Sequence, residues 1–303
     1  MYVLYLPPAH PSPSRKLAMR SASCFILASL GLQKTSKSPL ALFRKDDFGA
    51  ALNDGAKLAE EFFSDRDNVL AAVRLNGLLL SYADESLKRN KDVVVAAVKN
   101  DVKALEYADS SLKRDKDVFL AVVTQNGMAL EDADWNLKQD KDVVMAAVTQ
   151  YGYALMYADA SLKRDKDVAM AAVTQEGNAL EYTFSSLRGD KDVVLAAVTQ
   201  RARALRLADA SIRRDKDIVM AAVTQEGYAL EYADENLKRD KEVVLAAVTQ
   251  RGRALQFADE SLRRDKDVVM SAVTQSGRAL EFADEGLKRD RDVVRSLWPR
   301  STK

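Results

Sequence analysis

One 25-residue motif recurs along most of this 303-residue chain, with no insertion between its copies. The triplet Asp-Lys-Asp begins at residues 115, 140, 165, 190, 215 and 265, and close variants begin at residues 65, 90, 240 and 290. A fixed period of this length is typical of a solenoid, in which each copy packs mainly on its neighbours. The repeat therefore predicts an elongated array in place of ordinary globular domains.

The copy that begins at Asp240 (DKEVVLAAVTQRGRALQFADESLRR) shows why the repeat should be helical. Asp240 is a typical N-cap, and the apolar run VVLAAV follows it. Gly252 stands where a residue in the left-handed conformation would end this first helix. We expect a second, shorter helix over about 253–258, and Asp259 can cap a last turn that directs Leu262 inward.

Two columns of the repeat never change. Leucine occupies every 25th position from Leu80 to Leu280, and valine does so from Val73 to Val273. Helices this short are marginal in water alone, so each copy must bury its apolar side chains against the next one. In the copy that begins at residue 240, the expected apolar face of the first helix consists of Val243, Val244, Leu245, Ala247 and Val248. The predicted fold class is all-α, an α-solenoid of tandem 25-residue helix-turn-helix repeats.

Proline and charge divide the chain into four segments. All six prolines lie outside residues 40–298, as expected for a long helical domain. We expect a basic, acid-free leader over 1–45 and a degenerate N-terminal cap over 46–64, sealed by Phe62 and Phe63. Nine repeats should then occupy 65–289, and a truncated repeat with a C-terminal cap should occupy 290–303.

The leader has seven basic residues and no acidic ones, a composition typical of an organelle-targeting or signal segment. An unstructured leader, or a wrongly assigned start, is the alternative. Cys24 is the only cysteine, so no intramolecular disulfide can form, which weakly favours an intracellular location. No apolar run approaches the roughly 20 residues of a transmembrane helix.

The residue pattern argues against catalysis. The only histidine, His10, lies in the leader, so no Ser/His/Asp or Cys/His arrangement is expected in the repeats. The acidic residues recur at capping positions in every copy, whereas a catalytic pair is needed once. The Asp-x-Asp pattern lacks the further oxygen ligands and the glycine of a calcium loop. We therefore predict no catalytic residue, no cofactor and no metal site.

The columns that vary are the candidate binding surface. One column directly precedes the glycine (Asn76 through Ser276), and the other directly follows it (Leu78 through Arg278). Both should therefore lie at the junction of the two helices. Tyrosine and arginine, which are enriched at interface hot spots, cluster in these columns and beside them. A solvated edge that tolerates substitution is the competing interpretation. The candidate partner-binding residues are Tyr151, Tyr153, Tyr157, Arg201, Arg203, Arg206, Tyr228, Arg251, Arg253 and Arg278.

The strings DKDVVLAAVTQ and GYALEYADENLKRD, with their copies, resemble the repeats of the family called domain of unknown function 4116. The resemblance covers about residues 65–298. It implies a helical repeat fold, with two 25-residue blocks in tandem as the unit, and it implies no activity, cofactor or site.

Two functions fit this chain. The first is a non-enzymatic scaffold that binds a protein or peptide along the variable columns, as solenoids do. The second is single-stranded RNA binding, since some helical repeats contact one base per unit and Tyr and Arg stack on bases. Residues 46–303 hold 39 basic and 45 acidic residues, which argues against a polyanion as partner. We expect a protein or peptide partner.

Overall fold

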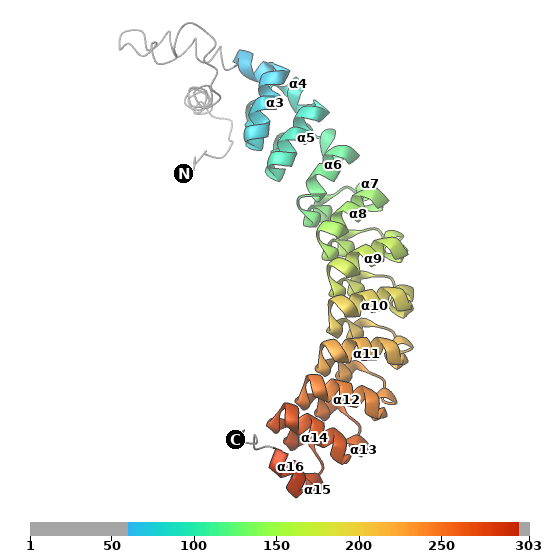
Figure 1. The fold of residues 1–303 in the computed structure, drawn as a ribbon. Helices are drawn as coiled ribbons and strands as arrows, with labels where there is room; N and C mark the ends of the chain where they lie inside the picture. The colour runs from blue at the N-terminus through green and yellow to red at the C-terminus, as the bar shows by residue number, and fades with distance from the viewer. Residues whose placement is uncertain (1–59, 297–303) are drawn as a thin grey trace, which may run out of the picture. The chain divides into compact units, whose positions relative to one another are not determined.

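The structure, a computed structural model, describes residues 60–296 (Figure 1). The chain divides into two compact units, residues 1–125 (unit 1) and residues 126–303 (unit 2). Every regular element within 60–296 is helical, which confirms the predicted all-α repeat fold. The leader, residues 46–59 of the expected N-terminal cap, and residues 297–303 lie outside the described residues.

Each complete repeat contains three short helical elements. The first is an α-helix, and these helices are α3 (Arg66–Leu75), α5 (Lys91–Asn100), α6 (Lys116–Val123), α8 (Lys141–Gln150), α9 (Lys166–Gln175), α10 (Lys191–Gln200), α11 (Lys216–Gln225), α12 (Lys241–Gln250) and α14 (Lys266–Gln275), with α16 (Arg291–Ser296) in the truncated repeat. The second is a 3₁₀ helix, and these are η2 (Gly77–Tyr82), η3 (Val102–Tyr107), η5 (Gly127–Asp132), η6 (Gly152–Tyr157), η8 (Gly177–Tyr182), η10 (Ala202–Leu207), η12 (Gly227–Tyr232), η14 (Gly252–Phe257) and η15 (Gly277–Phe282). The third is a turn or a short helix, namely α4 (Glu85–Lys88), η4 (Leu112–Arg114), α7 (Trp135–Gln139), η7 (Leu162–Arg164), η9 (Ser185–Gly189), η11 (Ile212–Arg214), η13 (Leu237–Arg239), α13 (Glu260–Arg263) and α15 (Glu285–Lys288).

Aspartate caps begin two of the three elements. The Asp240 carboxylate accepts hydrogen bonds from the backbone N–H of Glu242 at 3.0 Å and of Val243 at 3.2 Å, at the start of α12. The Asp259 carboxylate accepts one from the Ser261 N–H at 3.0 Å, at the start of α13. These bonds satisfy donors that have no partner within the helix. The expected capping roles of both aspartates are confirmed.

The glycine between the first two helices has a different role from the one expected. The second helix is a 3₁₀ helix, and it begins at Gly252 itself. The first helix ends at Arg251 in an extended conformation (φ −144°), and Gly252 does not adopt the left-handed conformation. A Cβ atom on Gly252 would lie 2.2 Å from the carbonyl oxygen of Ala272 in the next repeat. The prediction of a left-handed terminator was wrong; glycine is needed because adjacent repeats approach closely there.

The lysine of the Asp-Lys-Asp motif connects each repeat to the next. Lys141 Nζ lies 2.8 Å from a carboxylate oxygen of Asp165 and 3.0 Å from one of Asp167. Hydrogen bonds to Asp165 and Asp167 raise the pKa of Lys141 above its usual value. The same bridge is made by Lys166, Lys216, Lys241 and Lys266. Each exposed pair contributes only about 0–1 kcal/mol, so this ladder mainly fixes the register of the array.

Two further ladders hold successive repeats together. The backbone N–H of Asp259 donates to the Lys238 carbonyl at 3.0 Å, a bond between the turn segments of adjacent repeats. At the other end of the helices, the N–H of Gly252 donates to Gln275 Oε1 at 2.6 Å. The amide of Gln275 in turn donates to the Gln250 carbonyl at 3.3 Å. Because these bonds join residues at fixed offsets, they explain why the period admits no insertion.

The core of unit 2 is a continuous apolar cluster that extends from Ala169 to Val293. The valine column is buried throughout, and the leucine column is buried except at Leu105 and Leu280, which are partly exposed. On α12, the side chain of Leu245 is only partly buried, so the expected apolar face was too wide at this position.

At the start of the described residues, Phe62 and Phe63 are buried, and the Phe63 ring lies 5.7 Å from that of Tyr82. This position suits side chains that seal the first repeat. Among residues 60–296, no helix has the length and apolar character needed to cross a bilayer.

Candidate functional site at the helix junctions

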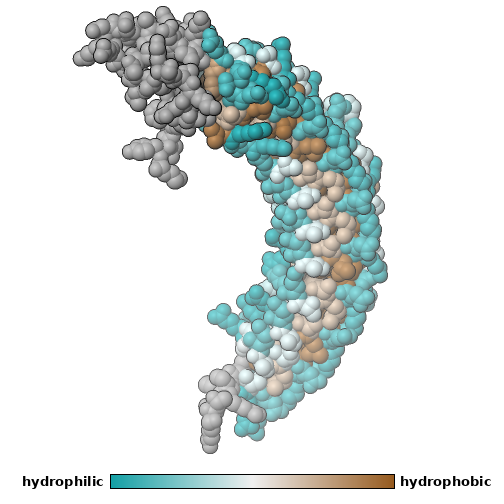
Figure 2. Space-filling view, turned by 45° about the horizontal axis from the view of Figure 1, so that its top comes forward, coloured by the Kyte–Doolittle hydropathy of each residue, from teal (hydrophilic) through white to brown (hydrophobic). Residues whose placement is uncertain are grey.

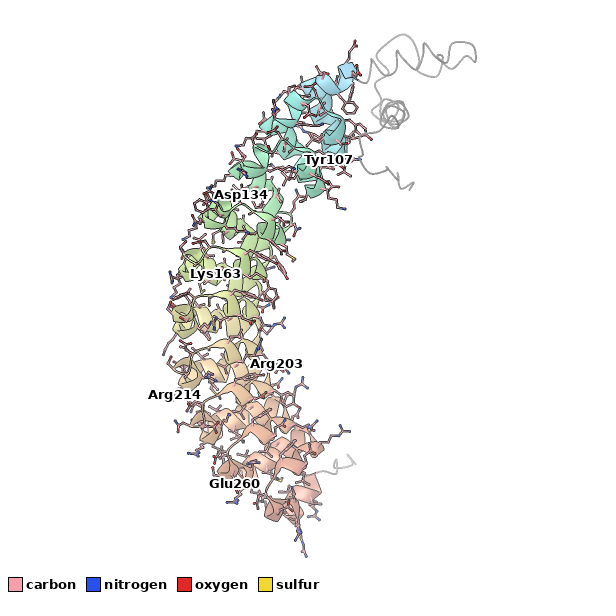
Figure 3. All side chains as sticks on the ribbon, turned by 180° about the vertical axis from the view of Figure 1, so that it is seen from behind. Tyr107, Asp134, Lys163, Arg203, Arg214 and Glu260 are labelled. Atoms are coloured by element: carbon pink, nitrogen blue, oxygen red, sulfur yellow. The ribbon has the colours of Figure 1, made fainter. Side chains whose placement is uncertain are left out.

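The two variable columns lie where the first helix of each repeat meets the second. Arg201 is the C-cap of α10, and Arg203 is the second residue of η10. Figure 3 shows Arg203 and Arg214 on opposite edges of unit 2, with Arg203 on the inner side of its curve. We call the edge that carries the variable columns the junction edge. The opposite edge, formed by the third elements, is the turn edge.

Three of the candidate tyrosines gather in one repeat of the junction edge. The ring centroids of Tyr151 and Tyr153 are 5.6 Å apart, and Tyr153 contacts Tyr182 of the next repeat at 6.0 Å. The Tyr153 hydroxyl also donates to Glu176 at 3.2 Å, and burial raises its pKa. A hydrogen bond with Glu131 raises the pKa of Tyr157. These contacts make the aromatic cluster part of the packing between repeats.

The same relation holds further along the edge. Tyr228 packs edge-on against Phe257 of the next repeat, with ring centroids 6.1 Å apart. The guanidinium of Arg253 lies 5.6 Å from the ring centroid of Phe282, again one repeat on. The second variable column thus packs on an aromatic column of the following repeat, which limits how freely it can vary.

Three of the six candidate arginines pair with residues of neighbouring repeats. Arg201 lies 3.0 Å from Glu176, Arg203 lies 2.7 Å from Glu226, and Arg253 lies 3.1 Å from Glu281. These hydrogen bonds and charges raise the pKa of Arg203, with Glu226 as the main cause. The pairs are exposed, so each contributes little to stability.

The other three candidate arginines form no ion pair within the described residues. The Arg251 guanidinium lies 5.7 Å from the ring centroid of Tyr228 and forms no ion pair within the described part of the chain. Arg206 and Arg278 are exposed, and no carboxylate of residues 60–296 lies within ion-pair distance of either. These are the candidate arginines that form no ion pair within residues 60–296.

Acidic and basic repeats alternate along this edge. Arg201, Arg203 and Arg206 come from one repeat, and Arg251 and Arg253 come from the next but one. The intervening repeat places Glu226, Tyr228 and Glu231 between them. The structure therefore divides the arginines into separate groups and does not form a continuous basic track.

A second, partly exposed surface was missed because the fifth residue of the first helix, Leu245 in the copy that begins at residue 240, was assigned to the apolar face. It consists of the fifth, sixth and ninth residues of the first helices, for example Leu195, Ala196 and Thr199 on α10. The Leu195 side chain is 43% exposed. The signal was present in the helical period, because residues 3, 4, 7 and 8 of each helix already complete one buried face and residue 5 falls outside it.

The acidic motif offers no open cation site. In each Asp-x-Asp pair of unit 2 from Asp165 to Asp292, at least one carboxylate is bridged by the lysine ammonium of the preceding repeat. Across residues 60–296, no group of three or more His, Cys, Asp or Glu side chains is arranged to hold a metal ion. His10 lies outside the described residues.

The fold and its ladders define a helical repeat protein of the solenoid type. Nine overlapping segments of the chain match the family described as domain of unknown function (DUF4116), at residues 65–113, 90–138, 115–163, 140–188, 165–213, 190–238, 215–263, 240–288 and 265–296. The chain belongs to this family, as its resemblance in sequence indicated. No curated protein and no solved structure matches the chain.

Proposed function

We propose that this protein is a non-enzymatic scaffold that binds a protein or peptide partner along the junction edge. The observation that carries the proposal is that the residues which hold the repeats together differ from those on the junction edge. Nearly invariant residues form the core and the ladders, whereas the side chains of the junction edge change from each repeat to the next. An array of this kind offers an extended surface whose recognition properties vary along its length.

The side chains of this edge favour a protein over a nucleic acid. Arg206, Arg251 and Arg278 are available for charged hydrogen bonds, and the tyrosines supply apolar area with a polar end. RNA carries a negative charge on every nucleotide and needs a basic track, which Glu226 and Glu231 interrupt. A protein segment with separated acidic residues meets the alternating charges without this repulsion.

The test compares two variants that lose the same kind of interaction on opposite edges. The first carries Arg201→Ala, Arg203→Ala and Arg253→Ala, which removes three ion pairs between repeats from the junction edge. It also carries Arg206→Ala, Arg251→Ala and Arg278→Ala, which removes the three arginines available to a partner. The control carries Arg214→Ala, Arg239→Ala and Arg264→Ala, which removes three such pairs from the turn edge. Both should unfold at nearly the same temperature as the wild type.

The full-length protein and both variants are used as bait in a lysate of the cells that express the protein, with and without nuclease. A partner that survives nuclease, is retained by the turn-edge control and is lost with the junction-edge variant supports the proposal. Equal capture by all three baits refutes it. RNA that is recovered at low salt and lost steeply as salt rises would instead identify a nucleic-acid-binding protein.

A further inference from the structure

The face of unit 2 formed by its first helices carries no charge along its centre. The fifth, sixth and ninth residues of α8, α9, α10, α11, α12 and α14 are methionine or leucine, then alanine or serine, then threonine. None of these eighteen residues is charged, although 30% of the chain is. We call this surface the uncharged stripe. The six threonines and Leu195 are exposed and the other residues of the stripe are partly buried. A contiguous surface of this kind commonly marks an interaction site.

The threonines make the stripe more apolar than their type suggests. Thr149, Thr199, Thr224 and Thr274 each donate the hydroxyl hydrogen bond to the carbonyl four residues earlier in the same helix, at 2.7–2.8 Å. Because the hydroxyl is satisfied internally, burial of the methyl group against another surface leaves no donor without a partner.

The stripe has charged and polar borders that suit the rim of an interface. Figure 2 shows it as a pale to brown band that follows the curve of unit 2 beside hydrophilic margins. Its outer margin is the lysine ladder, in which Lys166 pairs with Asp190 and Asp192 of the next repeat. Interfaces commonly have such an apolar centre and polar rim.

We propose that the uncharged stripe is the contact surface of a homodimer, covered by the stripe of a second copy of this chain. The eighteen residues and the lysines beside them match the roughly 20–30 residues that each partner contributes to a stable interface of standard size. A second copy has the same 25-residue period, so its methionines and leucines can lie over alanines of the first copy in every repeat. It also has the same curvature as the first copy. A partner that is one straight helix could follow the curved stripe over only a few repeats.

The curvature selects the arrangement of the two copies. A two-fold axis that crosses the stripe, between α10 and α11, superposes the curves of the two arrays and runs them antiparallel. α8 of one copy then lies opposite α14 of the other. Rotation about an axis along the stripe would instead cross the two curves and leave most of each stripe uncovered.

The test is the mass of the full-length protein in solution, measured by sedimentation equilibrium over about 1–300 µM, where weak interfaces dissociate. The wild type should approach twice the monomer mass. Leu195→Glu with Leu245→Glu should weaken association more than about 100-fold, because four unpaired carboxylates would enter a dry interface. Leu195→Met should leave association unchanged, since methionine occupies this column in other repeats.

The matched control is Met156→Glu, the same kind of change at a side chain that is 41% exposed but lies on η6, away from the stripe. It should dimerise as the wild type does. A wild type that stays at the monomer mass throughout refutes the proposal, and so does equal weakening by the control. Association that weakens steeply with salt also refutes it, because ionic contacts would then dominate.

Cross-linking keeps the proposal testable if the glutamate variant fails to fold. In a Cys24→Ser background, Met145→Cys (α8) and Met270→Cys (α14) are prepared separately and treated with a short bis-maleimide. In the antiparallel dimer, a mixture of the two proteins should cross-link and neither protein alone should. Cross-linking of either variant alone to the same extent as the mixture, or no cross-linking of the mixture, overturns the arrangement.

Discussion

Two Gly→Ala substitutions should change the stability of this array in opposite directions. Gly227 begins η12, and a Cβ atom there would lie 2.3 Å from the carbonyl oxygen of Ala247 in the next repeat. An ordinary contact needs about 1 Å more, so the two repeats must separate locally. Gly189 lies on the turn edge, where an added Cβ would meet only the flexible Asp209 side chain, at 3.1 Å.

The magnitude follows from the packing and the hydrogen bond that a methyl group at Gly227 would disturb. Overpacking costs about 1–3 kcal/mol, and the Gly227 N–H bond to Gln250 Oε1, at 2.7 Å, contributes about 0.5–1.5 kcal/mol. Reduced freedom of the unfolded chain offsets about 0.4–1 kcal/mol of this. Gly227→Ala should therefore lower the free energy of unfolding by about 1–3 kcal/mol. Gly189→Ala should raise the free energy of unfolding by about 0.4–1 kcal/mol, because only the reduced freedom of the unfolded chain acts there.

The repeats that naturally lack this glycine show how the array responds. Where Ala202 replaces it, Gln225 of the next repeat donates to the Thr199 carbonyl at 2.8 Å, whereas Gln250 and Gln275 donate to the carbonyls of Gln225 and Gln250. Where Val102 replaces it, the following helix, α6, has eight residues, whereas the other complete first helices have ten. Valine at this position thus accompanies a shorter helix in the next repeat, whereas the smaller Ala202 is followed by a helix of ten residues, α11.

Urea unfolding followed by circular dichroism at 222 nm measures both variants against the wild type. The expected result is a lower midpoint for Gly227→Ala and a higher one for Gly189→Ala. Equal midpoints for the two variants would refute the inference that the glycine column exists because of close approach between repeats.

Three other changes test the core and the ladders. Leu230→Asp places a charge at a fully buried position and should abolish cooperative thermal unfolding, since the cost exceeds about 4 kcal/mol; a retained cooperative transition would contradict the packing described. Hydrogen bonds from Ser261 and an ion pair with Arg239 lower the pKa of Asp259 to about 2. The ionised carboxylate therefore stabilises the fold fully above the pKa of aspartate in the unfolded chain, about 4, and this contribution should be lost as the pH falls toward 2. The melting temperature should therefore decline below about pH 4, and Asp259→Asn should decline less. Lys166→Met removes the exposed bridge to Asp190 and Asp192 and should lower the melting temperature only slightly, with a smaller effect of added salt than in the wild type.

The sequence was sufficient to predict the architecture because the repeat shows the same pattern nine times. Asp240 and Asp259 could be assigned as caps from their residue type and position, and both assignments are confirmed. Gly252 could not be interpreted correctly from one repeat. A glycine after a helix has two common causes, left-handed backbone and close approach, and the atom that decides between them belongs to Ala272 in the next repeat.

The ion pairs and hydrogen bonds of the ladders could not be predicted from the sequence for the same reason. A lysine between two aspartates, such as Lys166, suggests a solvated surface residue when one repeat is considered alone. Its partners are Asp190 and Asp192, 24 and 26 residues away, and they come within reach only once the stacking is known. The position of the candidate edge was predictable, because the helix junction follows from the period. The pairing of Arg203 with Glu226 was not.

Conservation among the repeats separates what the two surfaces can do. The junction edge changes from each repeat to the next, although two repeats share a pair of arginines (Arg201 with Arg203, and Arg251 with Arg253), so a partner that binds there must itself vary along its length, as a particular protein segment does. The uncharged stripe is nearly the same in all six repeats from α8 to α14, so its partner must have the same period, and a second copy of the chain meets that condition. In the antiparallel arrangement, the junction edges of both copies lie on the same side of the dimer. A partner with two binding segments would then gain from a high effective concentration at the second edge. Loss of the dimer should accordingly weaken capture of such a partner without any change to the junction edge.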